Sequence, residues 1–200
     1  VSVNATRGRL GLAPLTTAVI SSYVGHGVEV LVGRALGGRA SEAGIGDDIA
    51  FFKEHYHCHM LDHTVTYPGV REALAALEDR TMAVLTNKPV RFSCEMLRGL
   101  GILHYFSSVY GDGSLPYKKP HPAGVDQLMR DTGRGARETM MIGDSETDVL
   151  TGRNAGVWTC GVTYGIGSKT LERTPPDFML SDLRDLPSLL DGRRDAARKV

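Results

Sequence analysis

The amino-acid sequence predicts an α/β protein in which a core built on a parallel sheet follows a small all-helical unit. Short apolar runs alternate with amphipathic helical patterns after Tyr67-Pro68-Gly69, whereas only helical patterns precede that tripeptide. Strands and helices that alternate with short connections are typical of a parallel sheet covered on both faces. We therefore expect a helical domain over residues 1–66 and an α/β domain over residues 67–200.

The first unit contains three helical segments. Leu15–Val24 and Val28–Leu36 are short apolar segments separated by the glycine-rich turn Gly25-His26-Gly27. A longer helix is expected over Asp47–Leu61, because its apolar side chains recur at helical spacing. No convincing strand pattern occurs in this part of the sequence.

The second unit alternates strands with helices that begin or end at proline or glycine. Pro89 suits a first helical turn, Pro122 opens a helix and Gly133 closes it. Met82–Thr86 and Met140–Ile142 are short apolar runs of the kind that form buried strands. The other expected elements are helices over 70–77, 89–101 and 147–155, strands at 108–110 and 157–162, a strand and helix over 178–190, and a frayed tail from 191.

The composition excludes several classes of protein. Hydrophobic residues make up 42% of the 200 residues and charged residues 23%, which is ordinary for a soluble protein. The 23 basic and 23 acidic side chains balance, so no basic excess is available for nucleic acid or an anionic membrane. No apolar run approaches the ~20 residues of a membrane helix, no apolar signal core lies near Val1, and three scattered cysteines suggest reduced thiols. We expect a cytoplasmic monomer or homodimer with no nucleic-acid or membrane partner.

Polar residues follow the predicted strands, where the ligands of parallel sheets bind. Thr86 and Asn87 follow the first strand, and a hydroxyl with the next backbone amides can hold a phosphate oxygen. Lys119 lies in a loop stiffened by Pro120 and Pro122, where an ammonium suits a phosphate or carboxylate. Taken singly, Thr86 is more often a cap and Lys119 more often a solvated surface residue.

Gly143-Asp144 follows the strand at 140–142 directly, and Asp148 lies four residues after Asp144, on the first turn of the next helix. Two carboxylates on one side of a strand-to-helix junction favour a hard cation such as Mg²⁺. The alternative is a helix N-terminus whose acidic residues complement the dipole.

A histidine-rich stretch needs a separate interpretation. His55, His59 and His63 are spaced at i, i+4 and i+8, which could form a transition-metal face. They also fall near the apolar stripe of the same helix. We favour partly buried structural histidines over a metal site.

The order of these motifs resembles the haloacid dehalogenase superfamily, and specifically its phosphoglycolate phosphatase-like branch. The superfamily order is a strand with Thr-Asn, then Lys-Pro, then Gly-Asp-x-x-x-Asp. The resemblance extends over about Val3 to Leu190 and includes Tyr23-Val24-Gly25-His26-Gly27, Arg34-Ala35-Leu36, Tyr67-Pro68-Gly69-Val70, Leu85-Thr86-Asn87-Lys88-Pro89, Lys119-Pro120-His121-Pro122, Ile142-Gly143-Asp144-Ser145 and Val162-Thr163-Tyr164-Gly165.

The resemblance implies a Rossmann-like core and a Mg²⁺-dependent phosphatase of small phosphorylated metabolites, with 2-phosphoglycolate as the best candidate. Thr86 and Asn87 would bind the phosphoryl group, Lys119 would stabilise its charge, and Asp144 and Asp148 would ligate or orient Mg²⁺. The helical unit would be a cap that closes over the substrate.

The cap turn Gly25-His26-Gly27 would face the site, so that His26 would help to select the substrate. Other phosphatases or phosphomutases of the superfamily share the same motifs and remain alternatives.

One motif of the family is not found in the sequence. Family members carry the nucleophile and the acid/base on an Asp-x-Asp at the end of the first strand, and no Asp-x-Asp occurs among the 200 residues. That strand would lie between the strands of Thr86 and Asp144, so we expect those two strands either to stand about two strand spacings (~9.6 Å) apart or to have collapsed together. We also expect the 200 residues alone to be inactive. The alternative function is a catalytically inactive phosphate-binding or interaction module.

Overall fold

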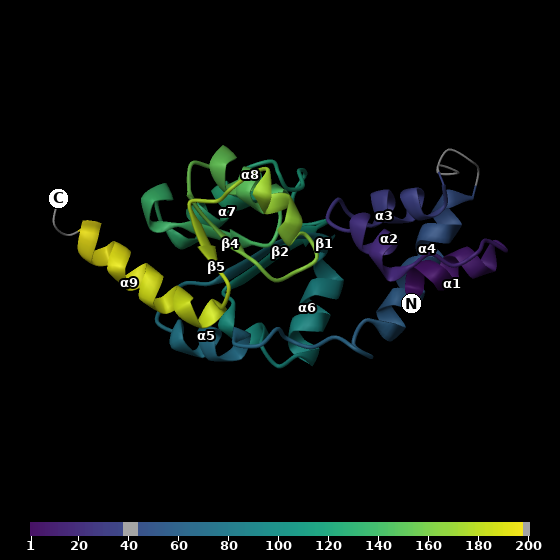
Figure 1. Cartoon of the computed structure of the whole chain (residues 1–200), viewed down its shortest axis with the longest axis horizontal. Helices are drawn as coiled ribbons and strands as arrows, with labels where there is room; N and C mark the ends of the chain where they lie inside the picture. Colours follow the sequence, from purple (N-terminus) through teal and green to yellow (C-terminus); the bar gives the residue numbers. More distant parts are fainter. Residues whose placement is uncertain (38–43, 198–200) are drawn as a thin grey trace.

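A computed structural model of the chain describes residues 1–37 and 44–197 (Figure 1). Nine α-helices and five β-strands are seen in these two ranges, with short 3-10 helices between them. The helices and strands are α1 (Ser2–Arg9), α2 (Thr17–Ser22), α3 (Val28–Ala35), α4 (Ile45–His59), α5 (Val70–Ala76), β1 (Ala83–Pro89), α6 (Val90–Gly99), β2 (Ser108–Asp112), α7 (Ala123–Thr132), β3 (Met140–Gly143), α8 (Glu146–Asn154), β4 (Trp158–Val162), β5 (Phe178–Leu180) and α9 (Leu186–Ala197).

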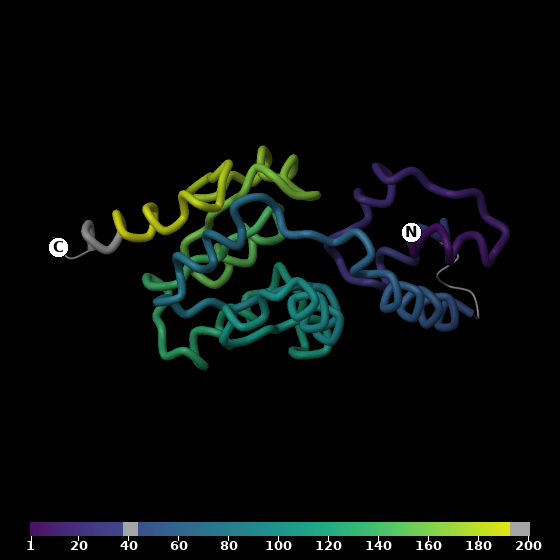
Figure 2. The backbone as a smooth tube through the Cα atoms, turned by 90° about the horizontal axis from the view of Figure 1, so that it is seen from below, coloured from purple at the N-terminus to yellow at the C-terminus, as the bar shows by residue number. Residues whose placement is uncertain are grey.

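The chain forms two lobes (Figures 1 and 2). The cap lobe consists of helices α1 to α4, and the core lobe consists of α5 to α9 with all five strands. The cap lobe has an apolar cluster of its own, because Phe52 of α4 packs against α1 and α3. Its buried members are Val3, Val28, Val32, Ala35, Leu36 and Phe52.

The strands of the core lobe are all parallel, which confirms the predicted α/β class. α6 packs on β1 and β2, and α8 packs on β3 and β4. In β1 and β2, Ala83 lies opposite Ser108 and Leu85 opposite Tyr110. β4 lies between β3 and β5. Parallel strands put their carboxyl ends at one edge, which is where the predicted site residues lie.

The strands fall into two separate sheets, so that the strands of Thr86 and Asp144 are not paired with each other, in agreement with the expected gap between them. β1 and β2 form one sheet, β3 to β5 form another, and no ladder joins β1 to β3 in the ranges that the structure describes. A continuous sheet needs a strand between β1 and β3 that can pair with both. The first residues do not supply it, since Ser2–Arg9 is helical.

Two element ends differ from the predictions. Pro89 is the N-cap of α6 and the last residue of β1, so it precedes the helix instead of opening its first turn.

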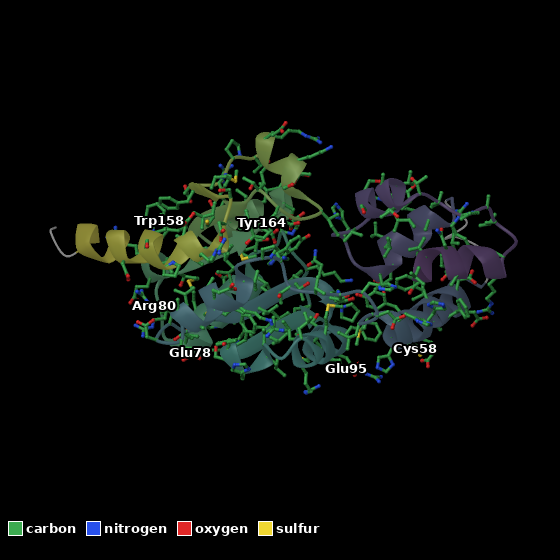
Figure 3. All side chains as sticks on the ribbon, turned by 60° about the horizontal axis from the view of Figure 1, so that its bottom comes forward. Cys58, Glu78, Arg80, Glu95, Trp158 and Tyr164 are labelled. Atoms are coloured by element: carbon green, nitrogen blue, oxygen red, sulfur yellow. The ribbon has the colours of Figure 1, made fainter. Side chains whose placement is uncertain are left out.

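The predicted fraying from Asp191 is wrong, because α9 continues to Ala197. Asp191 forms an ion pair with Arg80, which precedes β1, and this contact anchors α9 to the lobe (Figure 3 labels Arg80).

Within residues 1–37 and 44–197, no helix combines the length and the apolar character that crossing a membrane would require.

Candidate functional site

The carboxyl end of β1 contains a bulge, and the segment 86–88 lies in it. The β1–β2 register shifts between Leu85 and Pro89. Such bulges re-aim side chains and occur often beside active sites. The bulge lies close to the backbone of Gly111 in β2. Only glycine fits at this position, since a Cβ there would lie 2.5 Å from the Lys88 carbonyl oxygen. Within the bulge, the Thr86 hydroxyl accepts a hydrogen bond from the Lys88 backbone N–H at 3.1 Å.

Asn87 connects this bulge with two other segments of the chain. Its side-chain Nδ2 donates to the backbone carbonyl of Lys119 at 3.0 Å, and its Oδ1 accepts from the Lys119 N–H at 2.8 Å. Nδ2 also donates to the carbonyl of Gly25 in the cap turn, at 2.9 Å. Asn87 is buried, so the structure brings β1, the Lys119 loop and the cap turn together at one point.

Lys119 and Asp148 form a buried ion pair at the same edge of the core lobe. Lys119 Nζ lies 2.6 Å from Asp148 Oδ1, and only 13% and 8% of the two side chains are exposed. Asp148 is the third residue of α8, and its Oδ2 accepts hydrogen bonds from the N–H and hydroxyl of Ser145. Asp148 therefore completes a capping box as well as neutralising Lys119. The capping box agrees with the helix N-terminus alternative for this residue, the ion pair with Lys119 was not predicted, and the Mg²⁺ role stays a prediction.

Asp144 lies between β3 and the N-cap of α8, and not on the helix itself. Its Oδ2 accepts a hydrogen bond from the Gly167 N–H at 3.0 Å. Gly165 also lies against the Asp144 carboxylate, with φ of 120° and no room for a Cβ. The loop after β4 therefore fixes one oxygen of Asp144 by a backbone hydrogen bond.

The residues present fit Mg²⁺ through Asp144 better than through Asp148. In the part of the chain that the structure describes, no three His, Cys, Asp or Glu side chains form a metal-binding group. Mg²⁺ is commonly held by one or two carboxylates, with water and substrate phosphate completing its shell. Asp144 has one carboxylate oxygen bound to a single backbone N–H, whereas both oxygens of Asp148 already have partners.

A second lysine links the core lobe to the cap lobe. Lys118 Nζ lies 2.9 Å from Asp112 of β2 and 3.4 Å from Glu29 of α3. Burial opposes the charge of Lys118, yet the hydrogen bond and charge of Asp112, together with Glu29, raise its pKa. Burial likewise opposes the charge of Glu29, but its backbone hydrogen bond and Lys118 lower the Glu29 pKa. Both shifts favour the charged forms at neutral pH.

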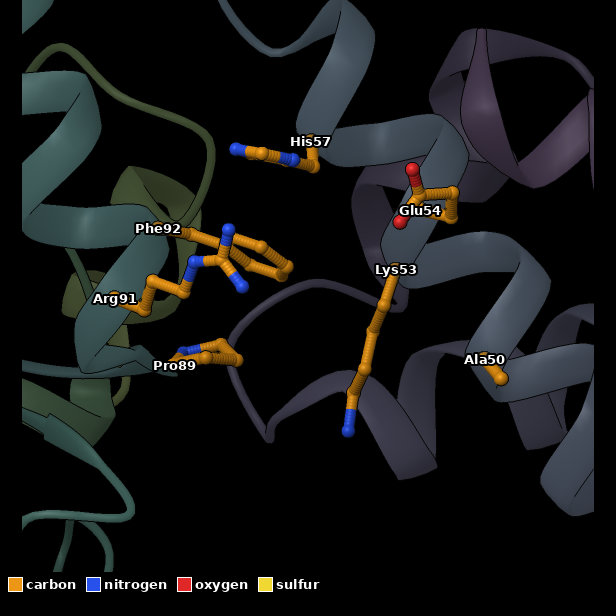
Figure 4. Close-up of a pocket in the computed structure, with 7 residues that line it drawn as sticks. All are labelled: Ala50, Lys53, Glu54, His57, Pro89, Arg91 and Phe92. Atoms are coloured by element: carbon orange, nitrogen blue, oxygen red, sulfur yellow. The ribbon is translucent and has the colours of Figure 1, made fainter.

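The other side of the lobe junction is formed by α4 and α6. His57 Nε2 lies 2.7 Å from Glu95, and the His57 ring stacks on Phe92 with centroids 5.9 Å apart (Figure 3 shows Glu95 at this junction). A cavity of about 260 Å³ opens between the two helices, with Lys53 and Arg91 on opposite walls (Figure 4). Thr86, Lys119 and Asp144 do not line this cavity, so it is separate from the cluster at the strand ends.

The structure also places the remaining candidate residues. His26 is exposed on the cap turn, whose Gly25 carbonyl contacts Asn87. His59 and His63 are exposed, and His59 pairs with Asp62, so their prediction as partly buried is wrong; His55 is partly buried and contacts Ser2.

Sequence reasoning missed the bridging role of Lys118. Its position beside Lys119 was a visible signal, but Glu29 lies 89 residues away and no local pattern links the two.

Comparisons with known proteins agree with this architecture. Residues 1–162 match a family described as haloacid dehalogenase-like hydrolase. A probable phosphoglycolate phosphatase of Pseudomonas putida is 36% identical over 96% of this chain and 78% of its own length. A phosphoglycolate phosphatase of Vibrio parahaemolyticus is 36% identical over 88% and 82% of the two chains. The crystal structure of a predicted phosphoglycolate phosphatase from Haemophilus somnus superposes with a TM-score of 0.85, at 29% identity over 94% of this chain and 88% of the other.

Proposed function

The chain belongs to the haloacid dehalogenase-like hydrolase family, and on that premise we propose that it hydrolyses small phosphoric monoesters, with 2-phosphoglycolate as the leading substrate. The proposal is carried by one observation, the buried Lys119–Asp148 pair at the strand ends. A buried ammonium beside a strand-to-helix junction offers a preorganised positive charge to a phosphoryl group. The names of the relatives from Pseudomonas and Vibrio support the choice of substrate.

We assign the phosphate site to residues from three strand ends. The Thr86 hydroxyl and the backbone amides of the β1 bulge would donate hydrogen bonds to phosphoryl oxygens. Lys119 would neutralise the charge that develops on the transferring group, while Asp148 keeps its ammonium in place. The cap turn, with His26 exposed on it, would cover the site and exclude water.

Mg²⁺ is the cation that this donor chemistry suits. Asp144 would supply a direct carboxylate ligand. Asp148 would not ligate the metal directly, because its two oxygens contact Lys119 and Ser145. When bound, the cation supplies neutralising charge to the phosphoryl oxygens.

The residue that accepts the phosphoryl group is not assigned within the 200 residues. Members of the family are expected to use the first carboxylate of an Asp-x-Asp, and none is present in the sequence. We propose that these 200 residues bind phosphate but do not turn over substrate without a strand that carries this motif. The division between β1 and β3 supports the proposal, since such a strand would pair with both.

Phosphate release measures this function directly. We would assay the 200-residue chain, and a chain extended at its N-terminus by a strand that ends in Asp-x-Asp, on 2-phosphoglycolate, a sugar phosphate and pyrophosphate, with Mg²⁺ or EDTA. We expect turnover only for the extended chain with Mg²⁺, fastest on 2-phosphoglycolate. EDTA-sensitive turnover by the 200 residues would show that the nucleophile has been misplaced. Absence of turnover by the extended chain would favour the inactive binding module.

Two variants of the extended chain test the assigned roles. Lys119→Ala should lower kcat about a hundredfold or more, comparable to the loss of one preorganised charge stabiliser. Asp144→Asn should weaken Mg²⁺ binding in calorimetry, because it removes an anionic ligand. Asp79→Asn, at an exposed carboxylate beside Arg80, is the matched control and should leave Mg²⁺ binding unchanged. Equal weakening by Asp144→Asn and Asp79→Asn would contradict the metal assignment.

A further inference from the structure

The side chain of Asn87 has no hydrogen-bonding proton left for a substrate. A carboxamide has two N–H donors and one oxygen. In this chain the two donors reach the carbonyls of Gly25 and Lys119, and the oxygen accepts from the Lys119 N–H, all at 2.8 to 3.0 Å. Asn87 is 7% exposed, so these partners replace water. The side chain of Asn87 therefore cannot donate a hydrogen bond to a phosphoryl oxygen, and a contact of that kind would come from its backbone.

The two bonds to Lys119 hold both polar groups of one backbone residue. A planar amide that accepts from the N–H and donates to the carbonyl of the same residue limits rotation of that residue. From this fixed backbone the Lys119 side chain reaches Asp148 at 2.6 Å. Asn87 thus orients the ammonium without touching it.

The third bond reaches the other lobe. Gly25 belongs to the cap turn, 62 residues away in the sequence, and its carbonyl accepts the remaining Nδ2 proton. When the cap turn moves away, this donor loses its protein partner, which is unfavourable for a buried polar group. The position of the cap turn and the backbone of Lys119 are therefore connected through a single carboxamide.

We propose that Asn87 is a positioning residue that couples docking of the cap turn to the orientation of Lys119. The inference rests on the proposed function for the meaning of Lys119, but the coupling itself is a property of the ligand-free chain. Aspartate cannot replace asparagine here, because an ionised carboxylate has no proton for either carbonyl.

NMR of the labelled full chain tests the coupling. Asn87→Ala should speed hydrogen exchange of the Lys119 amide about threefold to tenfold, which corresponds to one lost hydrogen bond. It should also shift the amide resonances of Gly25 and Gly27. Asn154→Ala is the matched control, because Asn154 donates one exposed hydrogen bond to Pro120 in the same loop and its contact does not involve the cap turn. It should leave the resonances of the cap turn in place.

A second arm uses inorganic phosphate as the probe. In the wild type, phosphate should shift the resonances of Lys119 and of the cap turn together. In Asn87→Asp the shifts at Lys119 should persist, while those at Gly25 and Gly27 fall at least threefold. A residue with a purely structural role would change thermal stability without separating these two responses.

Two results would overturn the inference. Cap-turn resonances that do not move in ligand-free Asn87→Ala would show that no coupling exists. Phosphate shifts at Gly25 that survive Asn87→Asp would show that the cap turn senses phosphate by another route. If wild-type chain does not bind phosphate while Asn87→Ala still moves the cap turn and the Lys119 amide, the proposed function fails and the coupling stands.

Discussion

Removing the ammonium of Lys119 should destabilise the fold more than removing any exposed cation. Lys119→Met keeps the aliphatic stem and deletes the charge that lies 2.6 Å from Asp148. The Asp148 carboxylate would remain at 8% side-chain exposure, facing a methionine in place of its cation. Water has little access to this carboxylate to replace the lost partner.

The expected cost follows from burial. Removing one partner of a buried ion pair typically costs about 3–5 kcal/mol, whereas an exposed pair contributes about 0–1 kcal/mol. Asp148 keeps two hydrogen bonds from Ser145, which favours the lower end of that range. We therefore expect a loss of about 3 kcal/mol in the free energy of unfolding. For a chain of this size that corresponds to a fall in Tm of roughly 6–12 °C.

Urea unfolding followed by circular dichroism measures this loss as a shift of the midpoint at constant slope. Lys118→Met provides a matched control, since the neighbouring lysine is 37% exposed and its loss should cost about 1 kcal/mol or less. The double variant Lys119→Met/Asp148→Asn removes both charges and should recover part of the loss. Equal midpoints for Lys119→Met and Lys118→Met, or strict additivity in the double variant, would refute the reasoning.

Three further predictions test local features. Gly143→Ala should lower the free energy of unfolding by about 1–3 kcal/mol in urea, because a Cβ would overlap the Asp148 side chain; unchanged stability would contradict this packing. Burial raises the pKa of the Cys160 thiol to about 11, so Ellman's reagent at pH 8 should not modify it in the folded chain, and rapid labelling would refute its burial. Hydrogen bonds from Arg184 lower the pKa of Asp182 to about 2, so the stabilisation they give is present above the ordinary value of 3.8 and is lost as pH falls toward 2. NMR titration of Asp182 should show this pKa, and Arg184→Ala, which removes the side-chain hydrogen bonds but keeps the backbone N–H, should raise it part of the way toward 3.8; an identical pKa in both chains would reject the cause.

Local chemistry was sufficient to predict most elements of the core lobe. Gly133 ends α7 in the left-handed conformation, with φ of 65°, as its place after an amphipathic segment predicted. The apolar run at 140–142 is the body of β3, and Asp148 falls on the first turn of α8. Each of these features depends on residues within one turn or one strand, so the sequence contains the information directly.

The continuation of α9 was not predictable in this way, and the division into two sheets was expected only from the absent family motif and not from the strand patterns. A strand pattern shows which residues can form a ladder, but not whether a partner strand lies beside them. The tail after Asp191 is highly charged, and its helix is anchored by Arg80, which lies 111 residues earlier. Both outcomes depend on contacts between segments far apart in the sequence.

In the candidate site, too, local features were predictable and contacts between distant segments were not. The sequence by itself determined the parallel α/β class, the cap preceding it, and the three segments that carry Thr86, Lys119 and Asp144, because periodicity and turn residues are local properties. Only the tertiary structure decided that Asn87 is bound to Lys119 and Gly25, and that Asp148 faces a lysine. Those partners lie 29 to 62 residues apart in the sequence. Folding of the core lobe brings Asn87, Lys119 and Asp148 together, and packing of the two lobes adds the contact with Gly25.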